Sequence, residues 1–534
     1  MHTNVLIVGA GPTGLMLANQ LARRGIKPLI IDRHSGPAQQ SRAMAVHART
    51  LEIYSKMGLA DQALALGARG TAGNMWANRH LTARVPVGDI GRGLSPYPFV
   101  LMLGQDDNEH ILGARLNEMG VIVQWNTELV SLQQHESHVE VILKRPDGSH
   151  KTLAANWVAG CDGSRSKVRE ACGIGFPGAP YEHTFFVADT VATGSMRPSE
   201  LNVYFDRGGF HLFFPMRGQD RWRVIGILPP ELRQKDGVTF EDVIPTIRDV
   251  AGVDLHFQSC AWFSTYKIHH RAAERFRQGR CFLLGDAAHV HSPMGAQGMN
   301  TGLQDAYNLA WKLAFVTAGR ANPALLDTYE AERLPVARAL LRTTDRNFQI
   351  VVDNHWIARL LRTHVIGRVV ARAMTFEGVR QRAFKALSQI GIAYHKSPLS
   401  KALGTLPRSA PKPGERFPWM KLRMKANGPV EDLFQALDDR QFNLLLIGQP
   451  EALAYTPIDM CALVRPHAIP IDAGNAAEFE RLKVPSPSYF LLRPDGHIAA
   501  SGGRFDALAV ERFLAPWLEA EDEGIIRLDR RKAA

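Results

Sequence analysis

The sequence predicts an α/β protein made of several domains, and three patterns support this fold class. Residues 4–14, NVLIVGAGPTG, join a short apolar strand to a glycine-rich turn and a helical pattern. Short alternating apolar runs between residues 185 and 262 predict a largely antiparallel sheet. After a proline- and glycine-rich stretch near residue 408, apolar runs are again separated by helical patterns. The 534 residues are enough for about two to four domains.

The N-terminal turn has the spacing G-x-G-x-x-G. Gly9 allows a tight turn, Gly11 lets the backbone approach a pyrophosphate, and Gly14 lets the helix pack closely on the strand. The N-terminus of that helix attracts phosphate charge. Asp32 follows the next apolar run, where an acidic side chain can bind a ribose hydroxyl. The pattern predicts a bound dinucleotide without saying which one.

The other elements follow from the same periodicities. Residues 323–400 have a helical pattern almost throughout, and a proline- and glycine-containing turn follows the strand that ends near residue 144. The expected helices lie at 47–57, within 101–120 and from Gly298 to 318, and the expected strands at 121–124, 139–144, 156–160, 280–284, 443–447, 460–464 and 489–493.

Composition excludes several classes of protein. The formal net charge is +11, but the lysines and arginines are scattered and follow no zinc-finger, RRM or basic-zipper pattern. We therefore expect no nucleic-acid partner. No apolar run reaches the ~18 residues that span a membrane, so we expect no stable membrane insertion.

The cysteines indicate a reducing compartment. They are five in number and widely spaced, and no two form C-x-x-C. A disulfide framework and a metal site are therefore not expected, and a cytoplasmic location is favoured. The five are Cys161, Cys172, Cys260, Cys281 and Cys461.

Two further motifs follow apolar strands. Residues 158–166 read VAGCDGSRS, and residues 281–289 read CFLLGDAAH. Together with the N-terminal fingerprint, and in this order, they resemble the class A FAD-dependent monooxygenases, the aromatic hydroxylase group. More narrowly, the chain is similar to the phenol-hydroxylase and polyketide-hydroxylase branch, which has a thioredoxin-like C-terminal domain.

The resemblance implies a discontinuous domain organisation. A Rossmann-like FAD-binding domain is followed by a mainly antiparallel substrate-binding sheet, a helical segment and a thioredoxin-like domain. Because the last domain lacks C-x-x-C, it is expected to support stability or homodimer contacts and to do no dithiol chemistry. The implied domains are 1–75, 98–180 and 278–345 for FAD, 76–97 and 181–277 for substrate, 346–407 for the helical segment and 408–534 for the thioredoxin-like domain.

The resemblance also implies which residues hold a non-covalent FAD. Asp286 would accept a hydrogen bond from a ribityl hydroxyl. Residues 293–300 would lead into a helix whose N-terminal amides point at the flavin ring. The expected contacts are Gly9, Gly11, Pro12, Thr13, Gly14, Asp32, Arg33, Arg42, Gln105, Asp162, Gly285, Asp286, Pro293, Gly295, Gly298, Met299 and Asn300.

The implied reaction is hydroxylation of a small aromatic substrate, phenolic or polycyclic. NADPH or NADH would bind transiently and reduce FAD. The reduced flavin would then react with O2 to give a flavin C4a-hydroperoxide, which is the oxidant. A base could remove the phenolic proton, and the candidates are Tyr204, His211 and His47, each of which could instead have a structural role.

At one position the sequence departs from the pattern of phenol hydroxylases, and this bears on the class of substrate. Phenol hydroxylases that ionise simple phenols have an aspartate two positions beyond the arginine that matches Arg42, and this chain has Met44 there. That argues against a simple phenol ionised by that particular base, and it leaves room for a larger or already acidic aromatic compound. Four alternatives stay open: an epoxidase, an antibiotic-inactivating monooxygenase, a reductase on the same fold, and a non-catalytic flavoprotein with an assembly role.

Overall fold

The fold is seen in a computed structural model, which divides into two compact units. The first unit holds residues 1–16, 29–304 and 336–389, and the second holds residues 17–28, 305–335 and 390–534. The residues that the structure describes are 2–38, 43–77, 79–206, 209–252, 254–292, 295–352, 367–455 and 463–518.

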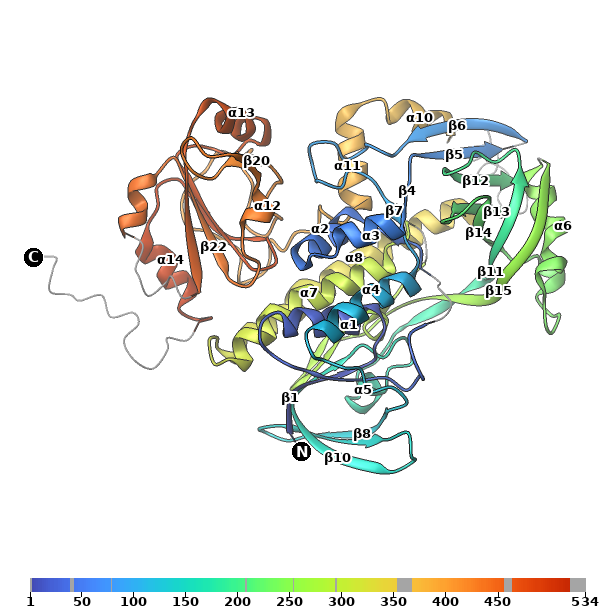
Figure 1. Cartoon of the computed structure of the whole chain (residues 1–534), viewed down its shortest axis with the longest axis horizontal. Helices are drawn as coiled ribbons and strands as arrows, with labels where there is room; N and C mark the ends of the chain where they lie inside the picture. Colours follow the sequence, from blue (N-terminus) through green and yellow to red (C-terminus); the bar gives the residue numbers. More distant parts are fainter. Residues whose placement is uncertain are drawn as a thin grey trace, which may run out of the picture. The chain divides into compact units, whose positions relative to one another are not determined.

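A seven-stranded sheet lies at the base of the first unit (Figure 1). In its centre, β1 (His2–Val8) runs parallel to β2 (Leu29–Ile31) on one side and to β10 (His150–Gly160) on the other. β17 (Cys281–Leu283) extends the sheet parallel to β10. Because parallel strands end at the same edge, the three sequence motifs that follow β1, β10 and β17 meet there. The sheet is completed by β8 (Glu128–Gln134), β9 (Val139–Lys144) and β16 (Arg277–Gln278).

The second sheet of this unit has eight strands and is antiparallel except between β12 and β5, so the alternating runs predicted it correctly. Helix α6 (Phe240–Ala251) covers one face, where Phe240 and Val243 pack against Phe186 and Phe213. In spatial order the strands are β18 (His289–Val290), β15 (Leu255–Ala272), β11 (Gly178–Gly194), β14 (Arg221–Ile227), β13 (Gly209–Pro215), β12 (Leu201–Asp206), β5 (Ala72–Ala77) and β6 (His80–Pro86).

Helices and a small three-stranded sheet complete the first unit. The helical pattern expected through residue 400 ends at Leu387, because Gln389 has a φ of 61° and cannot continue a right-handed helix. The helices are α1 (Pro12–Ala22), α2 (Ala48–Met57), α3 (Ala60–Leu66), α4 (Gln105–Glu118), α5 (Lys167–Ala171), α7 (Gly298–Thr317), α8 (Asp327–Val352), α10 (Gly367–Ala373) and α11 (Glu377–Leu387), and the small sheet is β3 (Ala45–Val46), β7 (Leu101–Met102) and β4 (Ala68–Arg69). Of these, α1, α7 and α8 each contribute residues to both units.

The second unit is built on a five-stranded sheet. Its strand β22 is buried along its whole length, with Phe442 and Leu444 in one hydrophobic core and Leu445 and Ile447 in another. This unit also includes residues 17–28 and 305–335, and a separate thioredoxin-like domain at 408–534 stays a prediction. The strand order is β19 (Lys401–Ala402), β25 (Ile498–Gly502), β24 (Ser488–Leu492), β22 (Phe442–Ile447) and β23 (Val464–Ile469), accompanied by β20 (Lys421–Arg423), β21 (Val430–Asp432), α12 (Leu433–Ala436), α13 (Ala473–Leu482) and α14 (Ala507–Leu514).

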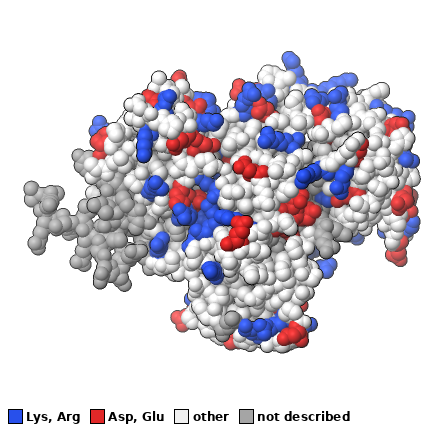
Figure 2. All heavy atoms as spheres, viewed as in Figure 1, with Lys and Arg blue, Asp and Glu red and all other residues white. Residues whose placement is uncertain are grey.

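Charged side chains of both signs lie across the face drawn in Figure 2. The net charge of +11 is therefore not gathered into one basic stripe on that face. Within the described ranges, no helix has both the length and the apolar character needed to cross a membrane.

A buried ion network lies in the second unit. Glu332 pairs with Arg493 at 2.6 Å and with Lys312 at 2.8 Å, and all three side chains are fully buried. Burial alone would raise the pKa of Glu332, but the two cations outweigh it and hold that pKa at about 2. Asp495 also pairs with Arg493, so each cation has a buried acceptor.

We predict that Glu332→Gln lowers the free energy of unfolding by ~3–5 kcal/mol, because the variant leaves the buried Lys312 without its carboxylate and Arg493 with only Asp495. Since the folded pKa of Glu332 is depressed, its stabilisation is present above about pH 4.5 and is lost as the pH falls towards 2. Urea unfolding at several pH values measures both effects. The exposed Glu451→Gln variant is the control, and equal stability of the two variants at neutral pH would contradict the prediction.

Candidate cofactor-binding and active site

The glycine-rich turn combines close packing with an open side. A Cβ atom on Gly9 would lie 2.3 Å from the carbonyl oxygen of Cys161, and one on Gly14 would lie 1.9 Å from that of Gly9. Gly9 also has a φ of 104°, which side chains disfavour. In contrast, a Cβ on Gly11 would meet no atom within 4 Å. The turn thus leaves room for a ligand at Gly11, while Gly9 and Gly14 pack against protein backbone.

Asp32 faces this turn from the end of β2. Its Oδ2 accepts a hydrogen bond from the backbone N–H of Ala10 at 2.7 Å, and its Oδ1 accepts one from the N–H of His34 at 2.9 Å. These two bonds fix the carboxylate beside the glycines. A carboxylate can accept about four hydrogen bonds, so Asp32 retains capacity for a ligand hydroxyl.

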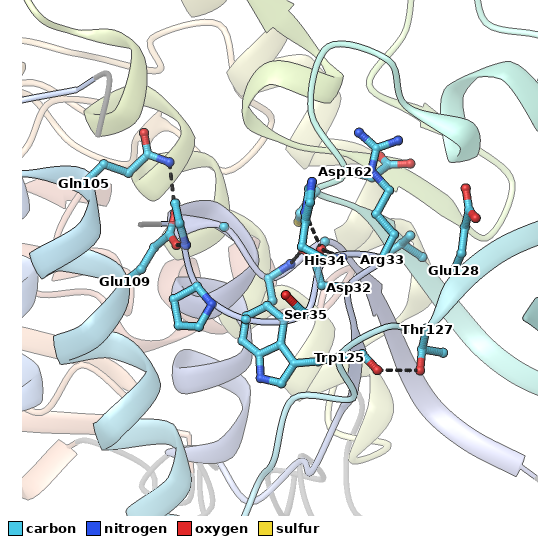
Figure 3. A pocket seen from close by; sticks show the side chains of 18 of the residues that line it. Asp32, Arg33, His34, Ser35, Gln105, Glu109, Trp125, Thr127, Glu128 and Asp162 are labelled. Atoms are coloured by element: carbon cyan, nitrogen blue, oxygen red, sulfur yellow. Dashed lines mark hydrogen bonds and ion pairs between the residues drawn. The ribbon is translucent and has the colours of Figure 1, made fainter. Parts of the chain in front are cut away.

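A cavity of about 1060 Å³ opens beside Asp32. Figure 3 shows Asp32, Gln105 and Asp162 around it, contributed by segments far apart in the sequence. Its volume is close to the upper end of ordinary cofactor and ligand sites, ~1,000 Å³. The acidic, basic and histidine side chains that line it are Asp32, Arg33, His34, Asp106, Asp107, Glu109, His110, Glu128, Asp162, Arg165 and Lys167.

Glu109 is a member of the cavity wall that the sequence analysis did not identify. One carboxylate oxygen accepts a hydrogen bond from Gln105 Nε2 at 2.9 Å, and the other accepts one from the N–H of Ala38 at 2.8 Å (Figure 3). Burial raises the pKa of Glu109. Gln105 is therefore oriented by a side chain one helical turn away. The i,i+4 spacing of Gln105 and Glu109 on α4 is the sequence pattern from which this contact could have been inferred.

Asp162 holds the start of α5. Its Oδ2 accepts hydrogen bonds from the N–H groups of Lys167 at 2.7 Å and Val168 at 3.3 Å, which the helix cannot satisfy itself. Burial raises the pKa of Asp162. Arg169 of the same helix donates to the carbonyl oxygen of Ala287 at 2.9 Å. These contacts join the second sequence motif to the third.

The third motif contacts the glycine-rich turn. Gly285 has a φ of 57°, and a Cβ there would lie 2.6 Å from Thr13 Oγ1. Asp286 is exposed although Gly285 and Ala287 on either side are buried, so its carboxylate can be reached by a ligand. A carboxylate in this position suits a ligand hydroxyl donor.

His47 and Asn300 brace the segment before α7. His47 Nε2 lies 3.0 Å from the carbonyl oxygen of Gly295, and burial lowers the pKa of His47 to about 4, so the neutral ring donates this bond. Asn300 Nδ2 donates to the carbonyl oxygen of Ala45 at 2.8 Å. The structure therefore brings His47 to this loop as a support. α7 begins at Gly298, followed by the partly exposed Met299, whereas Arg42, Pro293 and Met294 lie outside the described residues.

Tyr204 and His211 occupy directly paired positions on β12 and β13. Tyr204 stacks on Trp76 at 5.6 Å, and burial lowers the pKa of His211 to about 3. Among the described residues, the Tyr204 hydroxyl and both His211 ring nitrogens have no hydrogen-bond partner. Tyr204 belongs to the core under α6. Side chains alternate along β13, so His211 shares that face and Phe210, Leu212 and Phe214 point to the other.

The opposite face of this sheet leads to the loop before α7. It contains a cluster of Phe185, Phe205 and Phe210, packed with Leu212 and Tyr266. Farther along β13, Phe214 packs in a cluster with Ala296 of that loop. The apolar face and the loop thus meet at Phe214 and Ala296.

The residues of the cavity fit a bound FAD. The open side of Gly11 and the N-terminus of α1 suit a pyrophosphate, and the Asp32 carboxylate suits a ribose hydroxyl. Asp286 and the residues of the loop at Gly295–Gly298 are exposed or partly exposed, so a ligand can reach them.

Comparison with known proteins agrees with this fit. Residues 2–344 match a family model described as an FAD binding domain. The chain is 36% identical to 6-methylpretetramide 4-monooxygenase of Streptomyces rimosus, over 94% of this chain and 91% of that protein. It is 32% identical to rifampicin monooxygenase of Streptomyces venezuelae, over 93% and 95%. A solved complex of aklavinone-11 hydroxylase with FAD and aklavinone has a TM-score of 0.78 and 27% identity, over 96% and 99%.

The chain therefore belongs to the FAD-binding family of aromatic monooxygenases. The match spans the cavity, all three sequence motifs and the start of α8, and the relatives extend through the second unit as well. The sequence-based identification of family, cofactor and enzyme class is confirmed, and the protein is an FAD-dependent aromatic monooxygenase.

We predict that Gly14→Ala weakens FAD binding by about ten-fold or more, ~1.4 kcal/mol, because the added methyl group overlaps the Gly9 carbonyl. The ratio of flavin absorbance to protein after gel filtration measures retention. Gly113→Ala is the control, since a Cβ there meets no atom within 4 Å and alanine favours the helix α4. Equal retention in both variants would rule out the proposed packing role of Gly14.

Proposed function

We propose that this monooxygenase hydroxylates an extended phenolic compound with more than one ring, using O2 and NAD(P)H. The observation that supports this most is the apolar face of the eight-stranded sheet, which continues from the Phe185–Phe205–Phe210 cluster to the loop at Ala296. Relatives named for oxidation of tetracycline-type and other aromatic compounds point to the same class of substrate.

The length of that face favours several rings over one. Phe210, Leu212 and Phe214 are alternate residues of one strand, so they follow one another along the same side of the sheet at ~6.6 Å per step. A planar ring system lying along them would bury apolar area against each in turn. Aromatic side chains also hold planar rings by offset or edge contacts.

Met44 argues against a simple phenol. It is 7% exposed, and its carbonyl oxygen accepts a hydrogen bond from the N–H of Leu103 at 2.8 Å, so the segment is fixed with an apolar side chain. A thioether cannot take a phenolic proton. A substrate whose hydroxyl is acidified by a conjugated ring system has less need of a protein base.

We assign the cofactor's parts to the cavity as follows. Gly11 and the start of α1 bind the pyrophosphate, Asp32 binds the adenosine ribose, and Asp286 binds the ribityl chain. Gln105, oriented by Glu109, is a further hydrogen-bond donor or acceptor for FAD. When bound, FAD would provide the group that reacts with O2, and NAD(P)H would provide the electrons that reduce the flavin. Asn300 and His47 hold the loop that faces the ring, and the aromatic face excludes water and orients the substrate.

We predict that Asp286→Ala loses FAD, with binding weakened about ten-fold or more, because its hydroxyl acceptor is removed. Cofactor retention and reconstitution titrations measure the effect. Asp236→Ala, at an exposed loop position, serves as the matched control. Full FAD occupancy in Asp286→Ala would show that this assignment is mistaken.

The substrate class is tested with a panel of single-ring and multi-ring phenols. We expect NAD(P)H consumption coupled to a hydroxylated product only with the multi-ring compounds. Phe210→Ala should raise KM for them by ~10-fold, ~1.4 kcal/mol, because one buried ring contact is lost. Phe376→Ala is the control, since that ring is 58% exposed. Efficient turnover of single-ring phenols would refute the proposed substrate class.

A second candidate is oxidation of a finished antibiotic, favoured by the similarity to rifampicin monooxygenase over 93% of the chain. Adding rifampicin to the same panel separates the two candidates. Turnover of rifampicin well above that of every multi-ring phenol would favour this second function.

A further inference from the structure

An indole side chain lies in the wall of the cofactor cavity, beside the end of β2. Trp125 lines this cavity together with Asp32 and Ser35 (Figure 3). The side chain is only partly buried. Within the described part of the chain, no aromatic ring or cation of the protein stacks on the indole. A large aromatic surface therefore borders a ligand site and is left open to it.

Backbone hydrogen bonds hold this indole close to Asp32. The N–H of Gln124 donates to the carbonyl oxygen of Ile30 at 2.9 Å, and the N–H of Asp32 donates to that of Gln124 at 3.0 Å. After the tryptophan, the N–H of Thr127 donates to the carbonyl oxygen of Asp32 at 2.8 Å. The chain on both sides of Trp125 is thus tied to the acidic residue, and none of these bonds uses the indole.

The chain turns directly after the tryptophan. Asn126 has a φ of 51°, in the left-handed region that asparagine adopts more readily than most residues. Its N–H donates to the carbonyl oxygen of His34 at 2.8 Å. The carbonyl oxygen of Trp125 accepts a hydrogen bond from Thr127 Oγ1 at 3.1 Å. The backbone that carries the indole is therefore fixed, while the ring itself remains available to a ligand.

The position of Trp125 selects one part of the cofactor. Asp32 is assigned to the adenosine ribose, and the adenine base is bonded directly to that ribose. The adenine would therefore lie next to the residues that are hydrogen-bonded to Asp32, and among these residues the segment of Trp125 presents an aromatic side chain. Every nucleic-acid base has a flat π face that can stack on an aromatic side chain.

We propose that Trp125 stacks on the adenine ring of FAD and so anchors the adenosine end of the cofactor. This inference rests on the proposed assignment of the adenosine ribose to Asp32, and it does not depend on the substrate. Planar rings gain from offset or edge contacts. Stacking also removes apolar surface of both rings from water. Trp125 lies outside the three sequence motifs, so it would be a further cofactor-binding residue of this chain.

The test compares FAD with FMN, which has the flavin ring, the ribityl chain and one phosphate but no adenosine. After the cofactor is removed from the protein, reconstitution titrations give Kd for each flavin. In Trp125→Ala we expect Kd for FAD to rise about ten-fold, because one base–aromatic stack is lost, and Kd for FMN to stay unchanged. An unchanged Kd for FAD, or an equal rise for both flavins, would overturn the proposal. If FMN binds too weakly to measure, the FAD titrations of the following variants decide the matter.

Two variants separate stacking from damage to the fold. Trp125→Phe keeps an aromatic face, so Kd for FAD should stay within about two-fold of the wild-type value. A loss as large as in Trp125→Ala would show that the aromatic face is not what binds. Ile122→Ala is the matched control, because this side chain of the same segment is 75% exposed, and it should bind FAD as the wild type does.

The ribose assignment is tested separately with Asp32→Ala. Weaker FAD binding in this variant and in Trp125→Ala would support both assignments. Weaker binding in Asp32→Ala alone would remove the stacking role and leave the ribose assignment intact. No loss of FAD affinity in either variant would remove both.

Discussion

The structure depends on the close approach of two backbone segments at the carboxyl edge of the parallel sheet. The N–H of Cys161 donates to the carbonyl oxygen of Val8 at 2.7 Å, and the N–H of Gly9 donates to that of Ile31 at 2.8 Å. These bonds extend the ladder of β1 beyond its last residue. Only glycine fits at position 9, because any Cβ would lie 2.3 Å from the Cys161 carbonyl. Residues of this edge, among them Gly9 and Cys161, also line the cavity.

The same edge explains why distant motifs act together. β10 continues into the segment of Asp162, and the N–H of Leu284 donates to the carbonyl oxygen of Gly160 at 3.0 Å, which aligns the third motif with the second. Arg169 and Thr13 then tie the loops to one another. Asp32 and Asp162 therefore each accept hydrogen bonds from backbone N–H groups and also line the cavity.

The eight-stranded sheet carries an aromatic cluster on each of its two faces. One face forms a core with α6 that includes Tyr204, Phe213 and Trp222. The other carries Phe185, Phe205 and Phe210 and reaches the loop before α7. The two clusters have similar composition, and side chains alternate between them along each strand. Buried charges are paired in both units: Arg223 with Asp189 in this sheet, and Glu332 with Lys312 and Arg493 in the second unit.

The sequence alone determined the family, the cofactor and the order of the motifs, because glycines at a required φ and acids after strands are local features that spacing reveals. It also predicted both sheet types from apolar periodicity. Only the tertiary structure decided which face of the eight-stranded sheet meets the loop before α7. Alternation along a strand shows which residues share a face, but it does not show which of the two faces packs against that loop. The contact of Glu109 with Ala38 and the contacts of His47 and Asn300 with the loop before α7 could not be foreseen either. Each of them depends on packing between elements and not on spacing in the chain.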